Sequence, residues 1–365
     1  MGQVLGIGVS HYPPLSGNDS DMANILKGRI NDPDIPASVK DPATWPELMR
    51  KEWGSDSGAS GAAQHRAAMV GGLRRARKAL EEFNPDFVLI WGDDQYENFK
   101  EDIVPAFSVQ AYEDLVVYPW KHATESAMFN SNKKDEWGGG KPNVWGESAE
   151  THRVVKGHRQ GAKFVASELL KSEFDIAYSY KPLHHPSLAH AFLNAILYID
   201  YDREGFPWPV VPMAINCYGS NVISYRGFIS RWADRGREQD PPSPSPKRCF
   251  DLGAAVGRIL RASPYRVAVV ASSSWSHAFL VDKTYRMQPD AASDRELYQA
   301  MVDGNYSAWR EWGLEKLVDA GQQEVLNWFC LLGAMNEIGA KLKWSEFVES
   351  YVFNSNKVAA IFEAK

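Results

Sequence analysis

Strand-like and helix-like segments alternate along most of the chain, and this alternation constrains the fold more than any other feature. In the second half it consists of a helix at 160–170, a strand at 174–180, a helix at 187–198, a strand at 209–217, a helix at 250–262 and a strand at 266–271. Strands that are joined through helices usually run parallel in one sheet. We therefore predict an α/β fold with a mainly parallel central sheet, helices on both faces, long loop insertions and a helical C-terminal tail from about Arg295 onward.

The first half of the chain adds two strands and a long irregular segment. A short apolar strand spans Gln3 to Val9, and a buried strand begins at Phe87 after an amphipathic helix at 62–83. A further strand-like run lies at 103–109, and residues 121–150 are predicted to form a loop. Residues 16–60 are rich in Gly, Asp, Pro and Ser, which indicates loops with one short helix near 45–53. We expect one domain over residues 1–365, with a loop-rich insertion at about 16–60.

Composition narrows the class of partner. The chain has 46 acidic and 40 basic residues dispersed along it, for a net charge of -6, so it has no basic patch for nucleic acid or an anionic membrane. A small neutral or anionic substrate fits better. Cys217, Cys249 and Cys330 are far apart and odd in number, which favours free thiols in a reducing compartment. With no apolar run of membrane-spanning length and no signal-like start, we expect a cytoplasmic protein.

Several histidines and acids follow predicted strands. His11 lies just past the first strand, the pair His184-His185 follows the strand at 174–180, and His277 follows the strand at 266–271. Parallel strands bring their carboxyl ends to one edge of the sheet, so these side chains are expected to converge there. For each histidine alone, the simpler interpretation is a buried ring bonded to backbone.

The buried strand that begins at Phe87 ends in Gly92-Asp93-Asp94-Gln95. Two acids after a strand also commonly form an Asx turn or cap a helix, and Glu97 fits an ordinary surface or capping acid. Phosphate-binding, dinucleotide-binding, common zinc and nucleophile-elbow motifs are absent from the sequence. Any chemistry therefore depends on which metal or substrate the polar residues at the strand ends bind.

The ordered set of short motifs resembles the class III extradiol ring-cleavage dioxygenases, the family of the protocatechuate 4,5-dioxygenase β subunit and gallate dioxygenase. The motifs that carry the resemblance are Gly8-Val9-Ser10-His11-Tyr12-Pro13, the run from Asn84 through Phe99 to Phe107, Lys156-Gly157-His158, Glu173-Phe174-Asp175, His184-His185-Pro186, Lys247-Arg248-Cys249-Phe250, Ser276-His277, Glu324-Val325-Leu326-Asn327-Trp328 and Ser355-Asn356-Lys357-Val358-Ala359. Their order and approximate spacing agree with the family over most of the chain.

The resemblance implies a site in which two histidines and a glutamate hold Fe(II) and leave positions open for a catechol and dioxygen. His11 matches the first iron ligand and His185 the acid/base histidine. His277 falls on the family's Ser-His pair, a second catalytic position. His184 and Tyr12 are the expected substrate-binding residues beside these positions.

The other two ligand positions depart from the family. The second histidine aligns with Gln95, and Asp94 beside it is a further candidate ligand. The glutamate aligns with Ala292, so that Asp290 or Asp294 would have to replace it.

Three functions follow as hypotheses. The first is an oxidoreductase, a non-heme Fe(II) extradiol dioxygenase that cleaves a dihydroxylated or aminophenolic ring with O2 and works as a homo-oligomer, a dimer. The second is a redox-inactive or metal-independent hydrolase, lyase or isomerase that uses His11 and His185 for acid/base chemistry, with another divalent metal or none. The third is a non-catalytic subunit of a hetero-oligomer.

Overall fold

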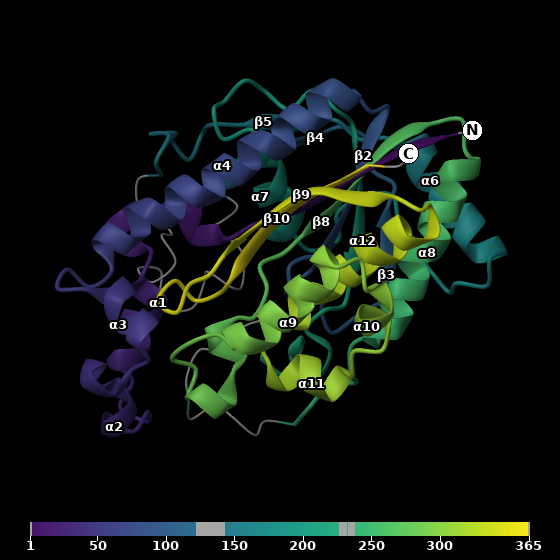
Figure 1. Ribbon diagram of the computed structural model, residues 1–365. Helices are drawn as coiled ribbons and strands as arrows, with labels where there is room; N and C mark the ends of the chain where they lie inside the picture. The colour runs from purple at the N-terminus through teal and green to yellow at the C-terminus, as the bar shows by residue number, and fades with distance from the viewer. Residues whose placement is uncertain (1, 122–142, 226–231, 233–237, 364–365) are drawn as a thin grey trace.

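An eight-stranded mixed sheet forms the centre of the computed structural model, which describes residues 2–121, 143–225, 232 and 238–363 (Figure 1). Its strand order is β6-β3-β7-β2-β8-β1-β10-β9. The bounds are β1 Gln3–Val9, β2 Phe87–Asp93, β3 Phe107–Gln110, β6 Ala177–Ser179, β7 Val210–Ile215, β8 Arg266–Ser272, β9 Lys341–Val348 and β10 Lys357–Glu363. A separate antiparallel pair joins β4 Leu115–Val117 to β5 Arg153–Val155. The predicted loop at 121–150 lies largely outside the described residues.

The four central strands β7, β2, β8 and β1 are parallel, as the alternation predicted. β3 pairs antiparallel with β7, and β10 pairs antiparallel with β1. All seven residues of β2 are buried, because helices cover both faces of the sheet. Alternate side chains of β2 enter opposite cores: Leu89 and Trp91 pack on one side, Val88 and Ile90 on the other.

Two groups of helices form the outer layers. The bounds are α1 Asn24–Ile30, α2 Ala37–Lys40, α3 Glu47–Trp53, α4 Ala59–Phe83, α6 Arg159–Lys171, α7 His190–Ile199, α8 Pro246–Ala262, α9 Ala291–Val302, α10 Tyr306–Arg310, α11 Leu314–Asp319 and α12 Leu326–Glu337. α4 and α7 pack on one face of the sheet, and α6, α8 and α12 pack on the other (Figure 1). The predicted irregular segment at 16–60 contains several short helices, including α3 where one was expected.

The C-terminal end differs from the predicted helical tail. The helices from α9 onward end with α12 at Glu337, and β9 and β10 follow. Gly339, with φ +68°, breaks the helical backbone just before β9. The apolar residues of β10 then cover the open edge of β1, whose backbone groups would otherwise lack partners. The tail is therefore helical only as far as Glu337.

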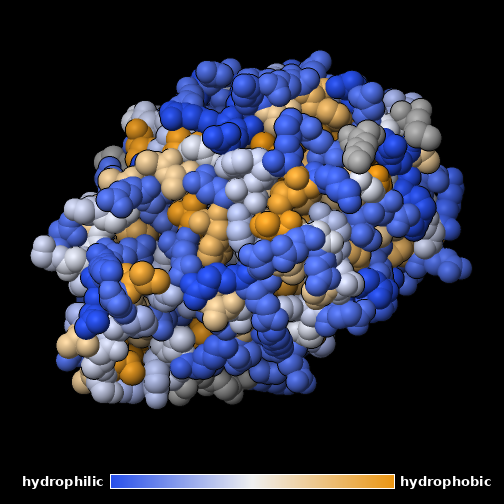
Figure 2. Space-filling model, in the orientation of Figure 1, coloured by the Kyte–Doolittle hydropathy of each residue, from blue (hydrophilic) through white to orange (hydrophobic). Residues whose placement is uncertain are grey.

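The surface agrees with the dispersed charges of the sequence. On the face seen in Figure 2, hydrophilic residues predominate and hydrophobic ones occur in small groups. Within the described residues, no helix combines the length and the apolar character that crossing a lipid bilayer requires. Cys217, Cys249 and Cys330 are buried free thiols.

Close packing of α8 on α12 gives a first testable prediction. A Cβ on Gly253 would lie 1.8 Å from the carbonyl oxygen of Cys330, so Gly253→Ala should lower the free energy of unfolding by about 1–3 kcal/mol through overpacking. Gly71 in α4 is the matched control, since a Cβ there would meet nothing within 4 Å. Gly71→Ala should raise the free energy of unfolding by up to about 1 kcal/mol. Urea denaturation of both variants measures this, and equal effects would contradict the packing argument.

Candidate metal centre

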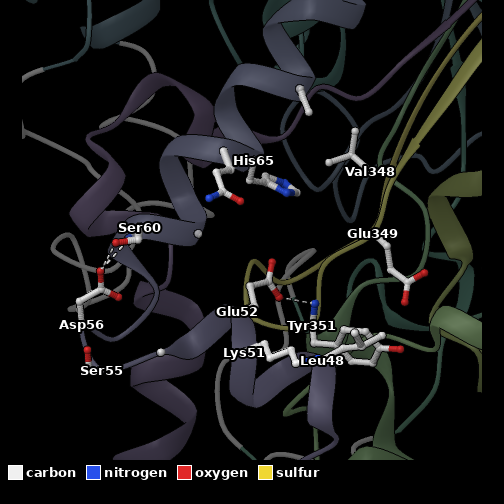
Figure 3. A pocket seen from close by; sticks show the side chains of 14 residues that line it. Leu48, Lys51, Glu52, Ser55, Asp56, Ser60, His65, Val348, Glu349 and Tyr351 are labelled. Carbon is white, nitrogen blue, oxygen red and sulfur yellow. Dashed lines mark hydrogen bonds between the residues drawn. The ribbon is translucent and has the colours of Figure 1, made fainter.

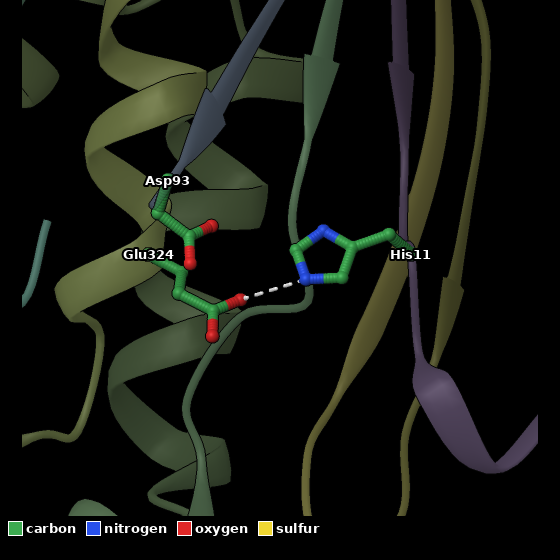
Figure 4. Close-up of side chains that lie close together, drawn as sticks. All are labelled: His11, Asp93 and Glu324. Atoms are coloured by element: carbon green, nitrogen blue, oxygen red, sulfur yellow. Dashed lines mark ion pairs between the residues drawn. The ribbon is translucent and has the colours of Figure 1, made fainter. Parts of the chain in front are cut away.

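His11, Asp93 and Glu324 converge at the carboxyl edge of the sheet (Figure 4). Each offers a metal-binding atom, and these atoms lie within 4.8 Å of one another. His11 follows β1, Asp93 is the last residue of β2, and Glu324 lies in the 3-10 turn Gln323–Val325 directly before α12. Because β8 alone separates β1 from β2, their ends deliver His11 and Asp93 to one place.

The ring of His11 has the orientation of a metal ligand. Its Nδ1 lies 3.0 Å from the carbonyl oxygen of Ser272, so Nδ1–H donates there and Nε2 keeps its lone pair. Nε2 lies 3.6 Å from Glu324 Oε2. Burial lowers the pKa of His11 well below its usual value, and the nearby His190 lowers it further. His11 is therefore a neutral imidazole that points its lone pair toward the two carboxylates.

Both carboxylates are buried and incompletely paired. Among the described residues neither oxygen of Asp93 has a hydrogen-bond partner of ordinary geometry, although the Asn327 amide lies near enough to favour the charged form. Burial raises the pKa of Asp93 to about 6. Glu324 Oε1 accepts a hydrogen bond from the Tyr218 hydroxyl at 2.5 Å, while Oε2 has no hydrogen-bond donor within the described part of the chain. Burial raises the pKa of Glu324 well above its usual value, and Asp93 adds to that shift.

Two buried carboxylates so close together are costly unless a cation or protons neutralise them. A divalent cation would balance both charges and take up the free oxygens of Asp93 and Glu324 together with the Nε2 of His11. The residues present therefore fit a divalent metal ion.

Two further histidines flank this cluster. His277 Nε2 lies 3.5 Å from Glu324 Oε2, and burial, with the charge of Lys357, lowers the pKa of His277 to about 3. The ring of His190 meets the ring of His11 edge to face, with centroids 5.0 Å apart.

Glu97 holds His190 in place. Its Oε2 lies 2.9 Å from His190 Nδ1, and its Oε1 accepts the backbone N–H of the same residue. Burial alone would lower the pKa of His190, but Glu97 and the other nearby acids outweigh it and raise this pKa to about 9. Glu97 is thus a buried capping acid. The sequence had allowed either a surface or a capping role for this residue. The centre is flanked by one neutral and one protonated imidazole.

The acids proposed from the sequence as further ligands have other partners. The Asp94 carboxylate accepts backbone N–H bonds from Glu97, Asn98 and Phe99, the turn role that the sequence also indicated. Gln95 is buried in the same turn.

Asp290 caps α9 by accepting the backbone N–H of Ser293, and it pairs with Lys283 at 2.8 Å. Asp294 is buried and accepts bonds from the side-chain amides of Gln322 and Asn356. The glutamate of this site is Glu324, which the sequence alignment did not select. Ala292 is the second residue of α9.

Of the other residues that the sequence proposed for the site, one is exposed and two are buried. His184 is paired with Asp102 at 2.9 Å on an exposed part of the loop before α7. His185 is buried, and its charge helps to lower the pKa of Glu97. The Tyr12 hydroxyl donates to the carbonyl of Met22, and its ring lies 3.8 Å below Lys357 Nζ.

The turn after β2 gives a second prediction. Asp94→Ala should lower the free energy of unfolding by about 2–3 kcal/mol, because the backbone N–H groups of this turn lose a charged, buried acceptor. The exposed Asp175→Ala is the control and should change it by less than about 0.5 kcal/mol. Chemical denaturation measures both. Equal stability of the two variants would contradict the role assigned to Asp94.

Comparison with known proteins agrees with the resemblance noted in the sequence. Residues 240–361 match the family described as the catalytic LigB subunit of aromatic ring-opening dioxygenase. This part of the chain is thus similar to the LigB family. It contains Glu324 and His277, whereas the LigB-family match does not reach His11 or Asp93.

Relatives with assigned activities extend the similarity. A 2,3-dihydroxyphenylpropionate/2,3-dihydroxicinnamic acid 1,2-dioxygenase of Comamonas testosteroni is 26% identical over 216 residues, 59% of this chain and 50% of that protein. A second enzyme of that description, from Pseudomonas putida, is 25% identical over 206 residues, which is 56% of this chain and 48% of the relative. The chain thus spans about half the length of the relatives it matches. The alignments show homology to 2,3-dihydroxyphenylpropionate 1,2-dioxygenases at low identity.

Proposed function

We propose that this protein is a ring-opening dioxygenase that acts on a dihydroxylated aromatic compound and holds a divalent ion with His11, Asp93 and Glu324. One observation carries the proposal: a neutral imidazole and two buried, incompletely paired carboxylates converge in a homologue of such enzymes. A structural role would not require two like charges to be buried side by side.

The donor set fits Fe(II), the ion that the family resemblance implies. Imidazole and carboxylate are both ligands for Fe(II), and three protein ligands leave coordination positions for other molecules. When bound, the ion would supply the electron transfer between a chelated aromatic diol and dioxygen. Here Asp93 provides a carboxylate where the family has a second imidazole, so the protein contributes two negative charges in place of one.

The flanking histidines supply acid and base groups. We propose that His190, protonated and held at Nδ1 by Glu97, presents Nε2–H to an oxygen of the substrate. His277, which is neutral, lies beside Glu324 and would orient the substrate there. His185 remains a further acid/base candidate because its charge acts on Glu97, which holds His190. His190 and His185 would thus move protons while the ring opens.

The relatives suggest the first substrate to test. Their names specify 2,3-dihydroxyphenylpropionate, so we propose a catechol that carries an acidic side chain as the substrate class. The protein should be purified anaerobically, loaded with Fe(II) and mixed with this compound in oxygenated buffer. We expect oxygen uptake and a yellow ring-opened product. If this catechol and protocatechuate both leave oxygen consumption at the level of the metal-free protein, the proposal is wrong.

A further inference from the structure

A cavity lies apart from the metal centre. It has a volume of about 590 Å3 and lies between α3, the first turns of α4 and the segment at the end of β9 (Figure 3). Its lining includes Leu48, Glu52, Asp56, His65, Val348 and Glu349. His11, Asp93 and Glu324 do not line it. The cavity is therefore a separate feature of the fold, open to a ligand of its own.

His65 provides an unpartnered polar group in the wall of this cavity. It is 4% exposed, and its Nε2 has no hydrogen-bond partner among the residues that the structure describes. Figure 3 shows the ring reaching from α4 into the space between that helix and the end of β9. Burial lowers the pKa of His65 well below its usual value, and the charges of Lys357 and Arg66 add to this shift. The ring is therefore neutral and has a lone pair for a donor.

Glu52 reaches the cavity from α3, on the opposite side. Its Oε2 accepts the backbone N–H groups of Tyr351 at 2.7 Å and Val352 at 2.9 Å, which fixes the carboxylate. In Figure 3 its other oxygen is turned toward the side of the cavity where His65 lies. Two acceptors on facing walls thus converge on one space.

The charges around the cavity favour a cation. Three carboxylates, those of Glu52, Asp56 and Glu349, line it together with one lysine, Lys51. Lys51 pairs with Glu47 at 2.7 Å, so its charge is already balanced outside the lining.

The other two lining acids pair with side chains outside the cavity or next to it, whereas Glu52 is held by backbone N–H groups and by the hydroxyl of Ser350. Glu349 pairs with Arg295 at 2.6 Å, and Asp56 accepts from Ser60. Lys357, the buried cation behind Glu52, directs its Nζ to the carbonyls of Phe353 and Ser355 and over the Tyr12 ring. An anion placed beside Glu52 would meet a negative charge.

We propose that this cavity binds a small organic ammonium ion. Its N–H groups donate to Glu52 and to the lone pair of His65, and its apolar part lies against Leu48, Ala68 and Val348. The volume suits a molecule with one ring or a short chain. This inference does not depend on the proposed dioxygenase activity.

Isothermal titration of the full chain at neutral pH with benzylammonium, benzyl alcohol and benzoate tests the proposal. These probes share a ring and differ in charge. Benzylammonium should bind about tenfold or more tightly than either of the others, since only it can donate a charged hydrogen bond to Glu52. Binding should persist in the Asp93→Asn protein, because the metal centre does not line the cavity. Equal affinity for all three probes, or no saturable binding of benzylammonium, would overturn the proposal.

Matched variants distinguish a direct contact between Glu52 and the ligand from a general effect of negative charge around the cavity. Glu52→Gln should weaken benzylammonium binding by about tenfold or more, whereas Asp56→Asn, which removes the same charge from a carboxylate already bonded to Ser60, should change it less than about twofold. If circular dichroism shows that Glu52→Gln does not fold, His65→Phe tests the second contact with the same expected loss. Equal losses in Glu52→Gln and Asp56→Asn, or full binding in His65→Phe, would contradict the proposed contacts.

Discussion

Replacing Asp93 with Asn should weaken divalent metal binding by about 100-fold or more, since it removes a donor oxygen and one of the two charges that balance the ion. The carboxylate has no other hydrogen-bond partner of ordinary geometry in the described structure, so no neighbour can take over its role. Anaerobic titration calorimetry with Fe(II), and with Mn(II) as an air-stable substitute, measures the change. Glu324→Gln should have an effect of similar size.

Asp290→Asn is the control for this experiment. Asp290 is an acid that the sequence made a candidate ligand, yet it caps α9 and pairs with Lys283. Its substitution should leave metal affinity within about threefold of the wild type, because a paired acid near the surface contributes little at a distance. Tight binding that survives Asp93→Asn but fails in Asp290→Asn would show that the ligands lie elsewhere.

Replacing His190 with Gln should lower kcat by about 100-fold to 10,000-fold, the range that a general acid or base contributes. Metal affinity should stay within a few-fold of the wild type, because His190 contacts the ring of His11 without being one of the three clustered ligands. Steady-state oxygen uptake and metal titration on the same preparation separate the two effects.

His184→Gln, in the loop before α7, is the matched control. His184 is exposed and pairs with Asp102, so its loss should change kcat by less than about twofold. A large loss of kcat in His184→Gln with none in His190→Gln would reverse the roles of the two histidines and contradict the site described here.

The fold was largely predictable because local patterns decided it. Alternating strands and helices predicted the parallel centre of the sheet, and the buried run from Phe87 predicted β2. The final strands β9 and β10 were not predicted. Their place depends on the open edge of β1, which lies at the opposite end of the chain. A local pattern cannot show which edge of a sheet a distant segment will cover.

The candidate site was only partly predictable, for a geometric reason. His11 and His277 were found because they follow strands, and strand ends meet at one edge. Asp93 was noticed but interpreted as a turn residue, a role that its neighbour Asp94 performs. Side chains change direction where a strand ends. An alignment without gaps therefore could not show whether the side chain of Asp93 or that of Gln95 faces the site.

Glu324 was missed because it does not follow a strand. It enters the site from a short turn before α12, and this helix packs on the sheet near β2 and β8. The signal available in the sequence was an acid between Gln322-Gln323 and the apolar run of α12, a place where a charge is unusual. The burial of Glu324 and its place beside His11 follow from the packing of α12, which the sequence alone did not reveal.

Oxygen consumption by the Fe(II)-loaded protein tests the central claim most directly. An oxygen electrode should record one molecule of O2 consumed for each molecule of catechol substrate converted to a yellow product, at a rate that disappears in Asp93→Asn and Glu324→Gln. Uptake that is absent from the wild type, or that continues unchanged in both variants, would contradict a ring-opening dioxygenase built on His11, Asp93 and Glu324.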